Sequence, residues 1–384
     1  MYTFAGGKRK YNNDTTDEMS SRMVCVADFE EYANEKLART YKEYFSSGAD
    51  QCQTLKENAE AFKRLRIRPR FLRDVSCRDL STTLLGEKVD FPVGVSSTAL
   101  QGLAWPDGDI CTARAAAQLH SCMIVSTYAN NSVEEISAAS PGGLKWFQLY
   151  IMPDRPFTQR LVRRAEAAGY KALVVTVDLP VVGKRYPDLK NRFHLPPHLS
   201  VPNLQGLQSS ASQSNDERNY GSGASPEDPA LCWKDIDWLS SITNLPIILK
   251  GILTAEDAGI ALDHPGVKGI LVSNHGGRQL DGVPATIEVL PEIVAAVGER
   301  LEVYLDGGVR TGTDVLKALA LGARAVFVGR PAIWGLAYNG EDGVAEVLKI
   351  LRNELDLAMA LSGCRCPAEI KHPLVVREEY YSKL

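Results

Sequence analysis

The 384-residue sequence lacks any apolar run close to the roughly 18–20 residues that a membrane-spanning helix requires. It also lacks an excess of either charge, since 43 lysines and arginines stand against 47 aspartates and glutamates. Proteins that bind nucleic acid or an anionic membrane favour a clustered basic surplus, so neither is expected as the main partner. What remains is an ordinary globular composition, 45% hydrophobic and 23% charged, long enough for one large barrel or two modest domains.

The N-terminal stretch MYTFAGGKRKYNNDTTDEMSS has no apolar segment of the kind found in a secretory signal, and its acidic residues argue against a mitochondrial presequence. We expect residues 1–24 to form a polar, flexible tail. The eight cysteines, from Cys25 to Cys366, show no paired CxxC spacing. This favours reduced thiols over disulfides or a zinc knuckle.

The sequence ends in Ser382-Lys383-Leu384. A C-terminal S-K-L is the address that the peroxisomal import receptor recognises, so we expect this receptor as a partner and the peroxisome as the location.

We expect one folded domain over residues 25–375, with a barrel over about 90–360. Residues 376–384 would then form a tail that presents the signal.

From residue 90 onward, apolar segments of strand length alternate with segments of helical period. The strand-like segments are 91–96, 122–127, 144–150, 172–178, 245–251, 269–274, 302–308 and 325–330. Near-continuous apolar strands separated by helices are typical of parallel strands buried on both faces, and eight is the number in a TIM (β/α)8 barrel. A doubly wound open sheet is the alternative, weakened because no G-x-G-x-x-G follows the first strand.

Three further signals complete the expected architecture. Thr254 to Asp257 resemble a capping box that begins a helix, and Gly322 is a natural helix end. The helical period of residues 27–64 predicts an N-terminal helical extension that covers the bottom or flank of the barrel. The long loop after the fourth strand is rich in Ser, Gly, Asn and Pro over 206–229, which favours a mobile lid over an inert linker.

Polar residues recur at the carboxyl ends of seven predicted strands. They are Ser126, Tyr128, Gln148, Tyr150, Thr176, Asp178, Lys250, Ser273, His275, Asp306 and Arg330. In a barrel, side chains at these ends point into the catalytic bowl. Such repetition is difficult to explain by packing, so we expect an active site there.

Two glycine-arginine clusters follow the seventh and eighth strands, at Asp306-Gly307-Gly308-Val309-Arg310 and at Gly329-Arg330. Loops at these places form the usual phosphate site of TIM barrels. Glycines let backbone N–H groups approach the phosphate oxygens, and arginine supplies a planar cation. The phosphate would belong to a substrate or to a cofactor such as FMN, and turn glycines with surface arginines are the alternative.

His275 is the candidate base, because imidazole titrates near about pH 6.5. Asp178, at another strand end, could hold the imidazolium that forms when a proton is taken. Arg278 and Arg185 offer two guanidinium groups suited to a carboxylate. No second His or Cys lies at ligand spacing from His275, so no metal site is expected.

Several segments of the sequence resemble those of the FMN-dependent α-hydroxy-acid oxidases, the glycolate oxidase family. Within this family, the similarity is greatest to the animal peroxisomal 2-hydroxyacid oxidases. These segments are SNHGGRQLDGVPAT (273–286), FQLY (147–150), TVDLP (176–180), KNRFHLPP (190–197), LDGGVRTGTDVLKALALGA (305–323), VGRP (328–331) and MALSGC (359–364). The resemblance covers about residues 25–370. It implies oxidation of 2-hydroxy acids with FMN as electron acceptor and O2 as oxidant, and a tetramer or octamer.

The resemblance also implies roles for individual residues. His275 would be the base, Asp178 its partner, and Tyr150 the hydrogen-bond donor to the substrate hydroxyl. Arg278, Arg185 and Tyr44 would hold the carboxylate, and Lys250 would stabilise negative charge on the reduced flavin. Thr98, Ala99, Ser126, Gln148, Thr176 and Ser273 would contact the flavin ring, and Asp306, Gly308, Arg310, Gly329 and Arg330 the ribityl phosphate. Whether electrons leave as a hydride or through a carbanion stays open.

Tyr128 lies where glycolate-preferring members of the family have Trp, and long-chain oxidases resemble this sequence there. We therefore expect a broad 2-hydroxy acid range that extends to longer chains. One alternative is a dehydrogenase with another electron acceptor, disfavoured by an N-terminal region without His and a polar loop near 200–230. Another is a non-catalytic FMN-binding protein, disfavoured because no base, carboxylate-binding or flavin-stabilising residue is missing.

Overall fold

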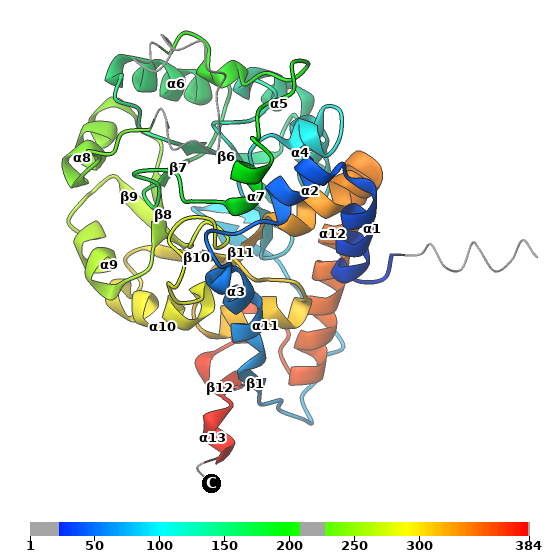
Figure 1. The fold of residues 1–384 in the computed structure, drawn as a ribbon. Helices are drawn as coiled ribbons and strands as arrows, with labels where there is room; N and C mark the ends of the chain where they lie inside the picture. Colours follow the sequence, from blue (N-terminus) through cyan, green and yellow to red (C-terminus); the bar gives the residue numbers. More distant parts are fainter. Residues whose placement is uncertain (1–22, 208–226, 383–384) are drawn as a thin grey trace, which may run out of the picture.

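The computed structural model describes residues 23–207 and 227–382. Eight parallel strands close into a barrel in the order β10-β11-β4-β5-β6-β7-β8-β9 (Figure 1). The strands are β4 (Val93–Val95), β5 (Cys122–Val125), β6 (Leu144–Leu149), β7 (Leu173–Thr176), β8 (Ile247–Ile252), β9 (Val267–Val272), β10 (Glu302–Asp306) and β11 (Ala325–Val328). Each lies within or overlaps a predicted segment, so the TIM barrel is confirmed and the doubly wound sheet is wrong.

Helices surround this barrel, as Figure 1 shows. They are α4 (Gly108–Gln118), α5 (Val133–Ala139), α6 (Arg155–Ala167), α8 (Trp233–Ile242), α9 (Ala255–Ala261), α10 (Thr286–Val297), α11 (Gly312–Ala320) and α12 (Arg330–Ser362). Thr254 caps α9 by accepting a hydrogen bond from the Asp257 amide, the half of the predicted capping box that the structure shows. Gly322, at φ +106°, follows α11 as expected of a helix end.

The barrel interior changes from apolar to polar along the strands. A buried lower layer contains Trp146, Val174, Ile248, Leu271, Tyr304 and Phe327. Two residues further along the same strands lie Gln148, Thr176, Lys250, Ser273 and Asp306. Because alternate residues of a strand face the same side, these polar side chains also face inward, nearer the carboxyl ends. The strand period therefore delivers them to the barrel mouth.

The N-terminal helices take two different positions. Helix α1 (Val26–Lys36) packs against α12 on the flank, as expected. The connection between α2 (Arg39–Ser46) and α3 (Gln53–Lys63) lies instead at the mouth, where the Ala49 amide donates to Gly277 O at 2.8 Å and the Asp50 amide to Lys184 O at 2.9 Å. The expected placement is therefore wrong for this segment. Helical period shows which face is apolar, not what that face covers.

The bottom of the barrel is closed by the hairpin of β2 (Thr82–Leu84) and β3 (Glu87–Val89), whose Leu84 and Val89 join the lower layer. After β7, the chain forms α7 (Tyr186–Lys190) and the short helix η2 (Pro202–Leu204). The predicted lid over 206–229 lies mostly outside the described residues, as does nearly all of the predicted tail over 1–24. None of the described helices is both long and apolar enough to cross a membrane.

Near the C-terminus, β12 (Val375–Arg377) pairs with β1 (Leu65–Ile67) in an antiparallel sheet. It follows the short helices η4 (Pro367–Glu369) and η5 (His372–Leu374) and precedes α13 (Glu379–Ser382). Strand β12 thus spans the expected boundary between the domain and its tail. Lys383 and Leu384 of the predicted import signal lie outside the described residues.

Candidate active site

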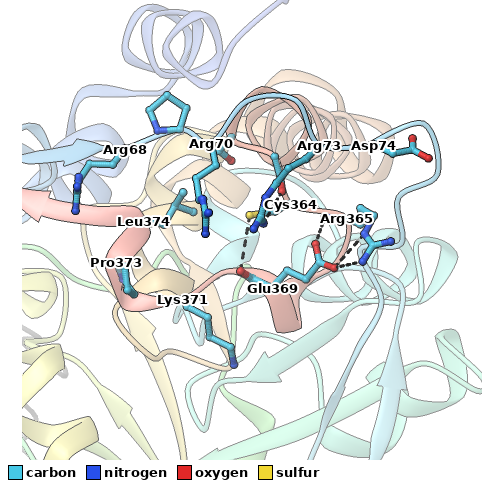
Figure 2. A pocket seen from close by; sticks show the side chains of 13 residues that line it. Arg68, Arg70, Arg73, Asp74, Cys364, Arg365, Glu369, Lys371, Pro373 and Leu374 are labelled. Carbon is cyan, nitrogen blue, oxygen red and sulfur yellow. Dashed lines mark hydrogen bonds and ion pairs between the residues drawn. The ribbon is translucent and has the colours of Figure 1, made fainter.

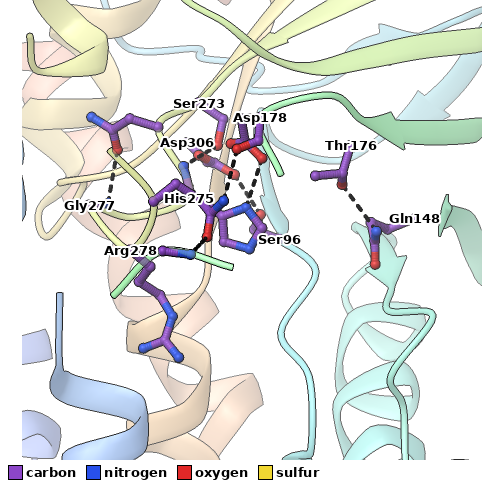
Figure 3. A network of polar contacts seen from close by, with 12 residues as sticks. Ser96, Gln148, Thr176, Asp178, Ser273, His275, Gly277, Arg278 and Asp306 are labelled. Atoms are coloured by element: carbon purple, nitrogen blue, oxygen red, sulfur yellow. Dashed lines mark hydrogen bonds and ion pairs between the residues drawn. The ribbon is translucent and has the colours of Figure 1, made fainter. Parts of the chain in front are cut away.

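His275 and Asp178 form a hydrogen-bonded pair at the barrel mouth, with Nδ1 2.9 Å from Oδ1 (Figure 3). Both follow a strand end, β9 and β7 respectively, and the His275 amide donates to Ser273 Oγ at 3.1 Å. A carboxylate only accepts hydrogen bonds, so Nδ1 carries the proton in this pair. The other imidazole nitrogen, Nε2, is then left as an acceptor, which is the form that a general base needs.

Charge and burial tune this pair. Burial disfavours the imidazolium and the nearby Lys250 ammonium repels it, so the pKa of His275 lies below its usual value. Burial alone would raise the pKa of Asp178, but the charges of His275 and Lys250 outweigh it and hold that pKa below its usual range. Asp178 is therefore ionised and His275 neutral at physiological pH. Lys250 is only 3% exposed, and no described residue accepts a hydrogen bond from its ammonium group.

The tyrosines expected around a substrate also lie at the mouth. The rings of Tyr128 and Tyr150 meet edge to face at 5.7 Å, and the Tyr128 hydroxyl donates to Glu227 Oε1. Burial and, to a smaller extent, the negative charge of Glu227 raise the pKa of Tyr150 well above normal. Its phenol therefore stays protonated and available as a hydrogen-bond donor. Tyr44 stacks on Phe193 at 4.6 Å between ring centroids.

Two arginines bring positive charge to the same region. Arg185 Nε donates to Arg278 O at 3.4 Å, and burial together with Arg278 lowers the pKa of Arg185 to about 10. Arg278 Nη1 donates to Tyr44 O at 2.6 Å and Ser47 O at 3.1 Å, while the guanidinium lies 5.0 Å from the centre of the Tyr44 ring. Figure 3 shows the Arg278 side chain extending away from His275. The structure thus brings Arg185, Arg278 and Tyr44 together, with Arg278 tied to the end of α2.

Three of the residues expected to contact a flavin ring, Ser126, Gln148 and Thr176, form a connected network at the ends of β5, β6 and β7. Gln148 Nε2 donates to Thr176 Oγ1 at 3.0 Å (Figure 3). Its Oε1 accepts from Ser126 Oγ at 3.4 Å. In the segment after β4, Thr98 Oγ1 donates to Ser96 O at 3.5 Å, and Ala99 packs partly buried against the core. The contacts of Gln148 thus hold the side chains of Ser126 and Thr176 in one polar network at the mouth.

The predicted phosphate site combines glycines at positive φ with the positive charges of several arginines. Gly307 and Gly308 have φ of +90° and +86°, and Gly329 caps α12, whose N-terminal amides are suited to an anion. Asp306 Oδ2 accepts from Ser96 Oγ at 2.7 Å, whereas its buried Oδ1 has no partner among the described residues. Such an acceptor fits a hydroxyl-bearing chain like the ribityl group of FMN.

Arg330 makes contacts that the sequence did not predict. Its Nε, Nη1 and Nη2 donate to the carbonyl oxygens of Phe45 at 2.8 Å, Gly276 at 3.0 Å and Ser47 at 2.9 Å. Burial and, to a smaller extent, the positive charges of Arg278 and Arg310 lower the pKa of Arg330 to about 9. Three arginines that repel one another favour a nearby anion, so the charge here fits the phosphate of FMN. Arg310 itself lies 4.8 Å from the centre of the Trp334 ring.

The sequence analysis missed four residues that shape the site. Ser96 could have been found, because it ends a predicted strand two residues after Gly94 and so faces inward. Gly251 lets Asp178 approach, since a Cβ there would lie 2.6 Å from the Asp178 Cβ. Glu227 and Phe193 come from irregular segments, where no periodic pattern indicates which side chains face the barrel.

Comparison with known proteins identifies relatives over nearly the whole chain. The family model described as FMN-dependent dehydrogenase matches residues 33–377. The chain is 52% identical to 2-hydroxyacid oxidase 2 of Bos taurus, covering 92% of this chain and 98% of that protein. It is also 52% identical to 2-hydroxyacid oxidase 1 of Homo sapiens, covering 93% and 97%. A solved structure of a mandelate oxidase variant with (S)-mandelic acid superposes with a TM-score of 0.83 at 40% identity, covering 91% and 98%.

Proposed function

Since this chain belongs to the FMN-dependent dehydrogenase family, we propose that it oxidises (S)-2-hydroxy acids to 2-oxo acids and reduces O2 to hydrogen peroxide. The observation that carries the proposal is the His275–Asp178 pair beside the buried Lys250 at the barrel mouth. The names of the relatives, 2-hydroxyacid oxidases, favour oxygen over another electron acceptor. FMN supplies the two-electron acceptor that no side chain can provide.

The chemistry of the protein is acid–base and electrostatic. His275 Nε2 takes a proton from the bound hydroxy acid, and Asp178 stabilises the imidazolium through Nδ1. The protonated Tyr150 donates a hydrogen bond to the substrate hydroxyl. Arg185 and Arg278 bind the substrate carboxylate, with Tyr44 beside them. Over one turnover the substrate loses two protons and two electrons, and O2 gains the same two protons and two electrons as it becomes hydrogen peroxide.

Cofactor binding divides between the two sides of the mouth. Thr98, Ala99, Ser126, Gln148, Thr176 and Ser273 would contact the ring of FMN, and Lys250 would supply positive charge to stabilise the negative charge of its reduced form. The amides of Gly308 and Gly329, the α12 N-terminus, and the charges of Arg310 and Arg330 would bind the phosphate. Asp306 Oδ1, which has no partner among the described residues, would accept a hydrogen bond from the ribityl chain.

The proposal is tested by peroxide release from the FMN-loaded enzyme in air, with glycolate, lactate and longer 2-hydroxy acids. We expect peroxide from several of these acids, and His275→Ala to abolish it while the bound yellow cofactor remains. Anaerobic bleaching of the flavin without peroxide in air would instead indicate a dehydrogenase with another acceptor. Failure of every acid to bleach the flavin would exclude 2-hydroxy acids as substrates.

The C-terminal Ser-Lys-Leu favours a peroxisomal location, reached through the import receptor. Removal of this tripeptide should leave a fluorescently tagged protein in the cytosol, whereas the full chain should collect in peroxisomes. We also propose a tetramer or octamer. Light scattering coupled to size-exclusion chromatography would measure the mass directly, and a monomer mass would exclude this assembly.

A further inference from the structure

A hollow of about 880 Å³ lies away from the barrel mouth, beside the C-terminal end of α12 (Figure 2). Its walls are the segment after β1, from Arg68 to Asp74, and the segment from Ser362 to Leu374. A volume of this size falls within the roughly 300–1,000 Å³ typical of small-molecule sites. It exceeds what a single inorganic anion fills, so a ligand of several groups is the appropriate match.

The walls carry a strong excess of positive charge. Arg68, Arg70, Arg73 and Lys371 all line the hollow, and Figure 2 shows Arg70 and Arg73 extending into the same space. Within the described residues, none of these four forms an ion pair. Arg78, on the same segment, differs because both its Nε and Nη2 bind the Asp356 carboxylate, at 2.7 and 2.6 Å. The hollow is therefore lined by four cations that have no carboxylate partner among the described residues.

The acids at this hollow are already engaged. Glu369 pairs with Arg365 at 2.6 Å and also accepts from the Arg365 amide. Asp74 accepts from the amide and hydroxyl of Ser76 and points away from the hollow in Figure 2. The negative end of α12 offers Arg73 only one long hydrogen bond, at 3.4 Å to Gly363 O. These contacts leave the guanidinium of Arg70 and the ammonium of Lys371 available to a ligand.

Apolar groups complete the wall. Leu374 is buried at the base of the hollow, and Pro69 and Pro373 lie beside it. Arginines bind phosphate oxygens through two parallel N–H groups, and prolines and leucine offer surface to a carbon skeleton. We propose that this hollow binds a phosphate-bearing organic anion, with the phosphates on Arg70, Arg73 and Lys371 and the organic part against Leu374.

The experiment is calorimetric titration of the full-length, FMN-saturated enzyme, in which the phosphate site of the barrel is filled. ATP and tripolyphosphate serve as probes, and citrate as a carboxylate of comparable charge. The ionic strength is held near about 0.15 M, where the screening length of about 8 Å suppresses diffuse attraction. We expect saturable binding that is tightest for ATP, weaker for tripolyphosphate and weakest for citrate.

The test variant is Arg70→Gln with Lys371→Gln, and its matched control is Lys349→Gln with Arg352→Gln, on α12 and outside the lining of the hollow. Both remove two positive charges. The test variant should bind ATP at least about tenfold more weakly, equivalent to about 1.4 kcal/mol, and the control should bind normally. The wild type and both variants should release peroxide equally and keep bound FMN, which would show that all three proteins are folded.

Four results would overturn the proposal. Absence of saturable ATP binding would remove the site itself. Equally weakened ATP binding in the test and control variants would mean that binding depends on overall surface charge and not on this hollow. Citrate bound as tightly as the phosphates would exclude phosphate selectivity, and tripolyphosphate bound as tightly as ATP would exclude a contribution from the organic group.

Discussion

His275 Nδ1 lies 2.9 Å from Asp178 Oδ1, although 97 positions separate these residues in the chain. Two features of the fold produce this contact. Parallel strands place both residues at one end of the barrel, and Gly251, on the strand between theirs, leaves room for the Asp178 side chain. The pair is buried beside Lys250, whose charge lowers the pKa of both His275 and Asp178.

Asp178→Asn should reduce kcat by about 10²-fold or more, because the imidazolium formed during turnover loses its counter-charge. His275 must be neutral to act as a base, so kcat/KM rises with pH through its pKa, which burial and Lys250 already hold below normal. Loss of the carboxylate lowers this pKa further, and the acidic limb of the pH profile should move to lower pH. The profile of Asp263→Asn, an exposed carboxylate, should not move. An unchanged acidic limb in Asp178→Asn would disconnect Asp178 from the base.

Arg330→Lys should destabilise the protein even without cofactor. The guanidinium binds the carbonyls of Phe45, Ser47 and Gly276, and a lysine ammonium cannot reach all three from one point. Loss of a hydrogen bond to a charged group costs about 1.5–3 kcal/mol of unfolding free energy. Denaturant unfolding of the apoprotein measures this loss, with Arg352→Lys on the same helix as the control. An apoprotein of normal stability with weakened FMN affinity would mean that the side chain acts only on the phosphate.

The barrel was predictable because its signal is local and repeated. Eight apolar segments of strand length can be counted without knowing how they pair, and the parallel arrangement follows from the helices between them. The polar residues at strand ends were predictable for the same reason. Lys250 occupies a fixed register position in a periodic segment, and Asp178 and His275 follow such segments within three residues, so closure of the barrel brings them together.

The rest of the site depends on contacts that no local pattern encodes. Arg330 looked like a phosphate ligand because it follows Gly329, yet three of its donors bind carbonyls at the end of α2 and in the loop after β9. The α2–α3 connection reaches the mouth through single backbone hydrogen bonds, such as that of Ala49 to Gly277 O. Glu227 becomes part of the site only because its loop folds back onto Tyr128.

Gly308→Ala should prevent normal FMN binding. A Cβ at this position would lie 1.9 Å from Asn58 O, so the loop after β10 must move away from α3. The control is Gly86→Ala in the β2–β3 hairpin, whose φ of +85° matches the +86° of Gly308 but whose Cβ would meet nothing within 4 Å. The control should lose about 1 kcal/mol of unfolding free energy through backbone strain alone and keep its FMN. Bound FMN per protein, measured by absorbance after desalting, separates the two; equal content would show that the loop tolerates the displacement.

Tyr128→Trp should shorten the range of accepted substrates. The Tyr128 ring packs against Tyr150, so a larger ring at this position takes space from the substrate side chain. Each methylene that no longer fits should cost about 1–3 kcal/mol in kcat/KM, while glycolate oxidation is preserved or improved. Peroxide release across 2-hydroxy acids of increasing length measures the change, and an unaltered length profile would place Tyr128 outside the substrate pocket.

Tyr128→Phe separates ring size from the hydrogen bond to Glu227. The phenyl ring keeps the pocket wall, so the length profile should remain that of the wild type. Glu227 Oε1 loses its donor, and Oε2 already lacks a partner among the described residues. Burial already raises the pKa of Glu227, and removal of the tyrosine donor should raise that pKa further. Unfolding free energy should therefore fall by about 1–3 kcal/mol at neutral pH, where the buried carboxylate is left without its hydrogen bond. Urea unfolding measures this loss. A shifted length profile in Tyr128→Phe would instead show that the hydroxyl itself, held by Glu227, contacts the substrate.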